Sequence, residues 1–254
     1  KGKKFKDKLP SQRELSNKKF DDLLKFSKSI DFTIYSDEFK TNLNTAISKF
    51  ENLSTIRNKV NTLDIKAGSA ISYYTKMNAI FLDNIVLIAR LSQNIEITQQ
   101  ITAYFSFLLS KERAGIERAV GANTLSRGSF GIDMKKKFTS LISAQDSYMN
   151  FFKYYASASS LDFLNNSMQG ESIDNVNKIR AELLEDVFKT EPTYWFSQIT
   201  KKINLLKKVD DNLANNLISN IQVIKSEAKT ELIISVTLSL LVVIFVLFLG
   251  RIIT

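Results

Sequence analysis

The sequence predicts an all-α protein, with elongated up-down helical bundles that continue into a C-terminal transmembrane helix. Only 8 Gly and 2 Pro occur among the 254 residues, so few tight turns or strand breaks can be placed. Hydrophobic residues make up 44% of the chain and aromatic residues 11%, which is enough for packed cores. The length allows either one elongated domain or two small bundles.

Helical spacing of apolar residues begins soon after the N-terminus. Residues 1–8, KGKKFKDK, are expected to form a solvated loop. Ser36 is a weak candidate for a helix cap, because the apolar spacing resumes three residues later. Gly68 marks the next break in the pattern. The helices expected in this part of the chain cover residues 10–29, 39–63 and 69–91.

The middle of the chain repeats the pattern of apolar helices and short polar breaks. RGSFG, residues 127–131, predicts a turn, and a loop is expected around Gly170. In the helix over 132–157, MKKKF at residues 134–138 is expected to be exposed. The side chains expected to point inward there are Leu141, Tyr148, Phe151, Phe152 and Tyr155. The helices expected in this region cover residues 94–126, 132–157 and 173–189.

Beyond Pro192 the apolar residues recur at alternating intervals of three and four, from Ile199 to Ile224. Asp210 and Asn220 fall on the same seam. The pattern fits a long bundle helix with two polar core positions. It also fits the seam of a parallel dimer along which a signal passes to the membrane. In either case the helix can continue without a break into the apolar run that follows.

That run, Leu232–Leu249, carries no charge and is interrupted only by small hydroxyl residues. About 20 apolar residues cross the hydrocarbon core of a bilayer, so the run and its flanks can span a membrane. Gly250 and Arg251 follow it directly, and the positive charge of Arg251 weakly places the C-terminus in the cytoplasm. We therefore expect residues 1–228 to be an extracytoplasmic domain, and residues 229–254 to be a transmembrane helix and the start of a cytoplasmic linker.

The composition also excludes several kinds of chemistry. The chain contains no Cys and no His, so thiol nucleophiles, imidazole bases and histidine metal ligands cannot be built. We expect no enzyme activity, no catalytic residue, no cofactor and no metal. The formal charge of +9 invites a nucleic-acid partner. We do not expect one, because Lys is spread along the helices and mixed with Glu and Asp.

Residues 111–122, KERAGIERAVGA, form a segment of charged and small residues within an otherwise apolar helix. On a helix, Ala114, Arg118 and Gly121 fall on one face, where small residues let helices approach closely. A guanidinium in such a seam needs a partner, since an unpaired buried charge is very costly. That partner is either an acid, such as Glu112, or a bound anion.

The same segment resembles the K-E-x-x-G-x-E-R-A-x-G-A signature of the nitrate- and nitrite-sensing domain of bacterial signalling proteins. Further similar stretches are LPSQRELSNKKFDDL, ISYYTKMNAIFLDNI and EPTYWFSQITKKINLLKKVDDNL. The resemblance covers most of residues 1–225. It implies an extracytoplasmic, all-helical ligand-binding domain between two transmembrane helices. We call residues 111–122 the signature segment.

The resemblance also implies site residues. In the family, arginines of the first helix and of the signature helix bind the anion, and Arg118 matches the signature arginine. Arg113 falls on a variable position, so its role in the anion site is our own inference. Arg180 either faces the same cleft or packs within its own helix, and we favour the second. Four signature residues are expected to orient arginines or to pack: Glu112, Gly115, Glu117 and Gly121.

One family pattern is missing, because no Q-x-E-R-G stretch of the first helix occurs in the sequence. We therefore expect part of the anion site to lie outside these residues. The expected whole is a homodimeric receptor in the bacterial inner membrane, in contact with lipid, with its sensor in the periplasm. It would bind nitrate or nitrite and act on a chemotaxis kinase and coupling protein. Alternatives are the input domain of a histidine kinase or diguanylate cyclase, or a helical scaffold that senses nothing.

Overall fold

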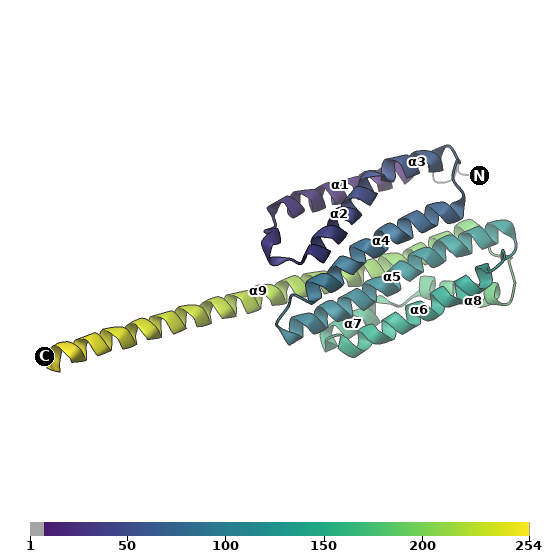
Figure 1. Ribbon diagram of the computed structural model, residues 1–254. Coiled ribbons are helices and arrows are strands. Elements are labelled where there is room, and N and C mark those ends of the chain that lie inside the picture. Colours follow the sequence, from purple (N-terminus) through teal and green to yellow (C-terminus); the bar gives the residue numbers. More distant parts are fainter. Residues whose placement is uncertain (1–7, 254) are drawn as a thin grey trace. The chain divides into compact units, whose positions relative to one another are not determined.

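A computed structural model describes residues 8–253, and within them the chain is helical with no β-strand. The predicted all-α class is confirmed, including the bundles and the long C-terminal helix. The chain divides into two compact units, Lys1–Leu91 and Ser92–Thr254. Figure 1 shows the helices of each unit.

The first unit is built from antiparallel helices with a small aromatic and aliphatic core. Phe39, Leu43 and Leu87 are its buried centre. Phe20 and Phe50 stack with ring centroids 3.9 Å apart, which holds the first helix against the second. The elements are α1 (Lys8–Ser29), the 3₁₀ turn η2 (Phe32–Ile34), α2 (Asp37–Glu51), α3 (Leu53–Asn61) and α4 (Ala67–Ala89).

Three boundaries in this unit differ from the sequence prediction. Helix α1 starts at Lys8, before the proline, and the rest of the predicted N-terminal loop lies outside the described residues. The predicted helix 39–63 is divided at Asn52. Gly68 lies in the first turn of α4 and does not mark a break, because a glycine there costs little. The cap at Ser36 is confirmed, since its hydroxyl accepts from the Phe39 amide at 3.2 Å.

The second unit is a bundle whose helices alternate in direction (Figure 1). Its elements are α5 (Ile95–Arg127), α6 (Met134–Tyr155), α7 (Ala158–Ser167), α8 (Glu171–Leu184) and α9 (Pro192–Ile253). Helix α5 packs against α6 and α9, and both α7 and α8 pack against α9. The core includes Phe107, Phe152 and Val209, all fully buried. Hydrophobic burial of such side chains stabilises by about 1.5–3 kcal/mol each.

The predicted turn 127–131 is confirmed, because Gly128 ends α5 with φ of 69°, a left-handed conformation that glycine adopts without strain. Other details were wrong. Helix α7 was not predicted. Phe138 of the predicted exposed MKKKF stretch is fully buried, whereas Phe151 and Tyr155 are 44% and 43% exposed. The face of α6 that packs inward therefore includes Phe138 and Phe152 and leaves the side chains next to Phe152 outside.

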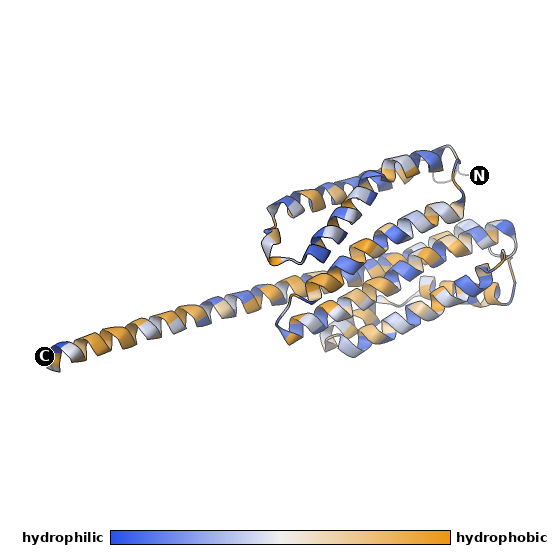
Figure 2. Ribbon diagram, in the orientation of Figure 1, coloured by the Kyte–Doolittle hydropathy of each residue, from blue (hydrophilic) through white to orange (hydrophobic). Residues whose placement is uncertain are grey.

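Helix α9 is a single helix of 62 residues that first packs in the bundle and then leaves it (Figure 1). Asp210 is 7% exposed and Asn220 binds Gln100 of α5, so both polar seam residues lie against the bundle. Beyond them the apolar run Leu232–Leu249 is exposed along its whole length. Figure 2 shows that this end of α9 is mostly hydrophobic. Among the described residues, α9 is the helix long and apolar enough to cross a membrane, with a mean hydropathy of 3.1 over its most apolar 18-residue window.

Candidate functional site

The signature segment lies near the C-terminal end of α5, where this helix is enclosed by α6, α8 and α9. Its charged side chains point in different directions around the helix and meet different partners. Glu117 is completely buried, and Arg118 next to it is half-buried. Because adjacent residues on a helix are about 100° apart, the two face separate surroundings.

Glu117 is the centre of a buried polar cluster. Arg180 of α8 binds it through both edges of the guanidinium, with Nε donating to Oε1 at 2.6 Å and Nη2 to Oε2 at 2.7 Å. Gln145 of α6 donates from Nε2 to Glu117 Oε2 at 2.8 Å, and its Oε1 accepts from Arg180 Nη2 at 3.0 Å. A bidentate pair with a third hydrogen-bonding partner satisfies a buried carboxylate. The cluster joins α5, α6 and α8.

Lys202 of α9 adds a second cation to this cluster. Its Nζ donates to Gln145 Oε1 at 3.3 Å, so its direct partner is a neutral amide. Burial and the nearby Arg180 lower the pKa of Lys202 to about 8, and the attraction of Glu117 and Asp146 opposes the shift only in part. Glu117 is therefore bound directly by Arg180, while Lys202 is held nearby through the neutral amide of Gln145.

Arg118 has a different environment. Its Nη1 donates to the Thr200 hydroxyl at 3.0 Å, and its guanidinium carbon lies 4.7 Å from the centre of the Phe196 ring, both on α9. Within residues 8–253 no carboxylate pairs with it, and burial alone lowers its pKa. A guanidinium has five N–H donors. In the described part of the chain, the Thr200 bond is the one hydrogen bond that these donors make.

The backbone at Arg118 is fixed by Trp195, a fully buried residue of α9. Its indole N–H donates to the carbonyl of Arg118 at 3.0 Å. The indole also lies against Gly121, where an added Cβ would be 2.5 Å from Nε1. Only glycine permits this approach. By contrast, a Cβ on Gly115 would meet nothing within 4 Å, so the predicted close packing does not occur there.

The remaining charged residues of the signature segment have partners elsewhere. Lys111 forms an ion pair with Asp210 of α9, and the Tyr104 hydroxyl donates to the same carboxylate at 2.6 Å. Arg113 lies over the Tyr148 ring of α6, 5.7 Å from its centre. Glu112 is half-buried on the same helix. The structure therefore does not bring Arg113 and Arg118 together, because the first faces α6 and the second faces α9.

The favoured interpretation of Arg180 was wrong, since it does not pack only within its own helix but binds a carboxylate 63 residues away. Sequence reasoning also missed the roles of Thr200, Gln145 and Lys202. Helical spacing identifies which residues share a face but not which face meets another helix. The one weak signal was the single Trp195, because a large aromatic side chain is expected to pack closely when it is buried.

Comparisons with known proteins show which sequences and which fold this chain is similar to. A family model described as nitrate and nitrite sensing matches residues 1–218. The nitrate regulatory protein of Klebsiella oxytoca is 23% identical over 172 residues, which are 66% of this chain and 43% of that protein. The structure of the NasR transcription antiterminator shares the fold, with a TM-score of 0.68 and 21% identity over 74% of this chain and 52% of that one. The chain thus spans about half the length of these relatives.

Proposed function

This chain belongs to the family of nitrate- and nitrite-sensing domains, and from that premise we propose that it is the extracytoplasmic sensor of a membrane receptor. The family resemblance predicted from the signature segment is confirmed. The receptor class, the site residues and the membrane placement are our proposal. In it, nitrate or nitrite binds at Arg118, and a rearrangement of helices passes through α9 to a cytoplasmic output.

The observation that carries the proposal is the guanidinium of Arg118. It is half-buried, it belongs to the signature segment, and no carboxylate neutralises it in the part of the chain that the structure describes. Nη1 is directed to Thr200, which leaves Nε and Nη2 as a coplanar pair of donors. A planar oxyanion accepts two parallel hydrogen bonds from such an edge.

The residues around Arg118 suit a weakly basic anion. Phe196 covers one face of the guanidinium and limits access of water, which strengthens electrostatic attraction. Arg113 lies against a different helix, so in this proposal it adds positive charge to α5 without sharing the oxygens that Arg118 binds.

Helix α9 supports the proposed route of the signal. It contacts Arg118 through Thr200 and Phe196, and it continues as one helix to the apolar run at Leu232. At 1.5 Å per residue, the distance between Thr200 and Leu232 is about 48 Å. A ligand that favours one position of α9 shifts the balance by its difference in affinity for the two states. The proposed output is a chemotaxis kinase with its coupling protein, reached through a homodimer in the bacterial inner membrane.

The two relatives are compatible with other output modules than a chemotaxis kinase. One is a regulatory protein and another a transcription antiterminator, so the expected absence of a nucleic-acid partner is not supported for the whole protein. The apolar run on α9 is the specific observation that favours a membrane receptor. A histidine kinase or a diguanylate cyclase can be driven by the same helix movement.

Isothermal titration of the full-length protein in lipid nanodiscs tests the ligand. We expect heat of binding with nitrate or nitrite and none with equal concentrations of chloride. Arg118→Lys keeps the charge but loses the forked donors, so affinity should fall roughly tenfold or more. Arg127→Lys, an exposed arginine on the same helix, is the matched control. Absence of heat with both anions would remove the ligand from the proposal.

Membrane placement has a separate test. The chain has no native cysteine, so a single introduced thiol is the sole site for a thiol reagent within it. The outer membrane is first made permeable while the inner membrane stays closed. In these cells, a membrane-impermeant maleimide should label Asn204→Cys, which is exposed on α9. Arg251→Cys should be labelled only after the inner membrane is opened. Labelling of both cysteine variants while the inner membrane is closed, or of neither variant, would contradict the proposed topology.

A further inference from the structure

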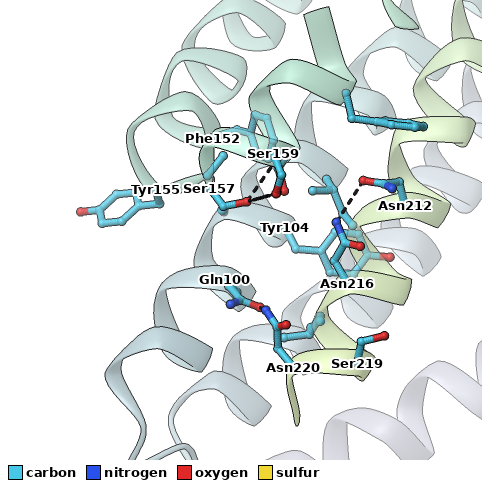
Figure 3. A pocket seen from close by; sticks show the side chains of 16 residues that line it. Gln100, Tyr104, Phe152, Tyr155, Ser157, Ser159, Asn212, Asn216, Ser219 and Asn220 are labelled. Atoms are coloured by element: carbon cyan, nitrogen blue, oxygen red, sulfur yellow. Dashed lines mark hydrogen bonds between the residues drawn. The ribbon is translucent and has the colours of Figure 1, made fainter. Parts of the chain in front are cut away.

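We propose that the second unit holds another ligand site, a cavity between α5, α7 and α9 that takes a neutral, hydroxyl-rich molecule of the size of a monosaccharide. The cavity has a volume of about 450 Å³ and is shown in Figure 3. It is separate from Arg118, which is not among its lining residues. The inference does not depend on nitrate binding.

The size of the cavity excludes nitrate as its natural occupant. A water molecule takes about 30 Å³ of liquid, so the cavity corresponds to roughly 15 waters. Nitrate, with four heavy atoms, would fill a small part of it. A pyranose, with twelve heavy atoms, would fill a much larger part of it and leave room for bridging waters. The volume also falls within the range of pockets that bind small organic ligands, roughly 300–1,000 Å³.

The lining determines the charge of the ligand. None of the residues that line the cavity is Asp, Glu, Lys or Arg. A charged ligand would leave water without gaining an ionic partner, which is unfavourable. The polar lining groups are amides and hydroxyls, which both donate and accept hydrogen bonds. This chemistry selects a neutral ligand with hydroxyl groups.

Three asparagines one helical turn apart, Asn212, Asn216 and Asn220, line the α9 wall, and Figure 3 shows their side chains beside Tyr104 and Gln100. Asn216 donates to Asn212 at 3.1 Å, and Asn220 donates to Gln100 at 3.0 Å. Among the described residues, these bonds leave the Asn216 and Asn220 carbonyl oxygens and the Asn212 amide nitrogen for a ligand.

The wall opposite α9 provides further groups that can contact a ligand. Ser157 and Ser159 at the start of α7 supply hydroxyls, and Phe163 supplies an apolar ring. A pyranose has polar hydroxyl edges and less polar C–H faces, so it can meet both kinds of wall. The lining thus combines polar groups that orient a ligand with aromatic surface that buries it.

The position of the cavity links it to signalling. Tyr104 lines it and donates to Asp210, the carboxylate that pairs with Lys111 of the signature segment. Asn220 precedes the apolar run at Leu232 by about 18 Å along the helix. An occupant that bridges α7 and α9 would hold α9 just before it leaves the bundle. The site is therefore placed to act as a second input on the same helix.

Thermal unfolding and isothermal titration of the chain of residues 1–254 in lipid nanodiscs test the site. The neutral probes are glucose, galactose and myo-inositol, and the charged probes are glutamate and putrescine. We expect at least one neutral probe to bind with a dissociation constant below about 1 mM, and neither charged probe to bind at that concentration. No binding of the neutral probes, or equal binding of the charged ones, would overturn the proposal.

Variants on two walls locate the binding. Asn216→Leu removes an amide on α9, and Ser159→Phe fills the cavity from α7, so each should weaken binding at least tenfold. Asn204→Leu makes the same change on an exposed face of α9 outside the cavity and should bind as the natural chain does. The melting temperature without ligand shows which variants are folded. If the folded variants keep the affinity of the natural chain, the ligand binds elsewhere and the assignment is wrong.

Discussion

Glu117 and Arg118 are neighbours in the chain, yet their surroundings differ in the property that matters for ligand binding. Glu117 is fully buried and its carboxylate is bound by Arg180 and Gln145. Arg118 is half-buried and is bound by one hydroxyl and one aromatic ring. The carboxylate of Glu117 is fully hydrogen-bonded within the protein. The guanidinium of Arg118 has further N–H donors that make no hydrogen bond within the described chain.

The signature segment therefore has two sides with different roles. The Glu117 side of α5 fastens three helices together, so changing it should damage the fold. The Arg118 side is held in place by Trp195 through its backbone, so its side chain can be changed at small cost to stability. Signature residues thus divide into those that build the bundle and Arg118, whose remaining donors our proposal assigns to an anion.

Replacement of Glu117 should have the largest effect. Glu117→Gln leaves Arg180 and Lys202 buried without a carboxylate, which should cost about 3 kcal/mol or more. For a domain of this size, that corresponds to a fall in Tm of roughly 10 °C. Thermal unfolding by circular dichroism measures it, with the exposed Glu185→Gln as the control. A fall no larger than that of the control would show that the cluster does not stabilise the bundle.

The two glycines of the signature segment should respond in opposite directions. Gly121→Ala forces a methyl group against the Trp195 ring and should destabilise by about 1–3 kcal/mol. Gly115→Ala meets open space within a helix and should stabilise by up to about 1 kcal/mol. The same melting experiment compares them. Equal effects of the two substitutions would mean that the indole does not fix this part of α5.

The buried Lys202 makes the stability of the folded chain depend on pH. Its folded pKa of about 8 lies below the ordinary value of 10.5, so the unfolded chain binds more protons between these values. The penalty for burying the ammonium is thus full below pH 8 and is relieved as pH rises towards 10.5. Lys202→Met should be more stable than the natural chain at pH 7, on the order of 1–2 kcal/mol.

That advantage should shrink as pH rises from 8 to 10.5. Melting temperatures across this range check it, and Lys201→Met, the exposed neighbour, serves as the control. A difference between Lys202→Met and the natural chain that stays constant with pH would show that Lys202 is not buried in its charged form near neutral pH.

Much of the fold could be predicted, because it depends on spacing within single helices. The absence of Gly and Pro over long stretches predicted the helices, and the predicted start at residue 94 lies one residue before the start of α5. The apolar run predicted the emergence of α9 from the bundle. Helix α7 was missed because it is short and rich in Ser and Asn, which carry a weak apolar signal.

The site was harder to predict because its contacts join helices far apart in sequence. The signature segment identified Arg118, but the Thr200 and Phe196 contacts depend on how α5 and α9 cross. Arg180 looked like an ordinary helix residue, since nothing in its local spacing indicates a carboxylate 63 residues away. Pairing between helices is a property of packing, which a one-dimensional pattern does not contain.

The most direct test of the account is the nitrate affinity of Arg118→Gln beside that of Arg113→Gln, measured by isothermal titration of the full-length protein. Loss of the forked donors at Arg118 should weaken nitrate binding by roughly 10- to 100-fold, the effect of one or two charged hydrogen bonds. Arg113, which faces Tyr148 on α6, should change it by less than about threefold. Wild-type nitrate affinity in Arg118→Gln would contradict the account.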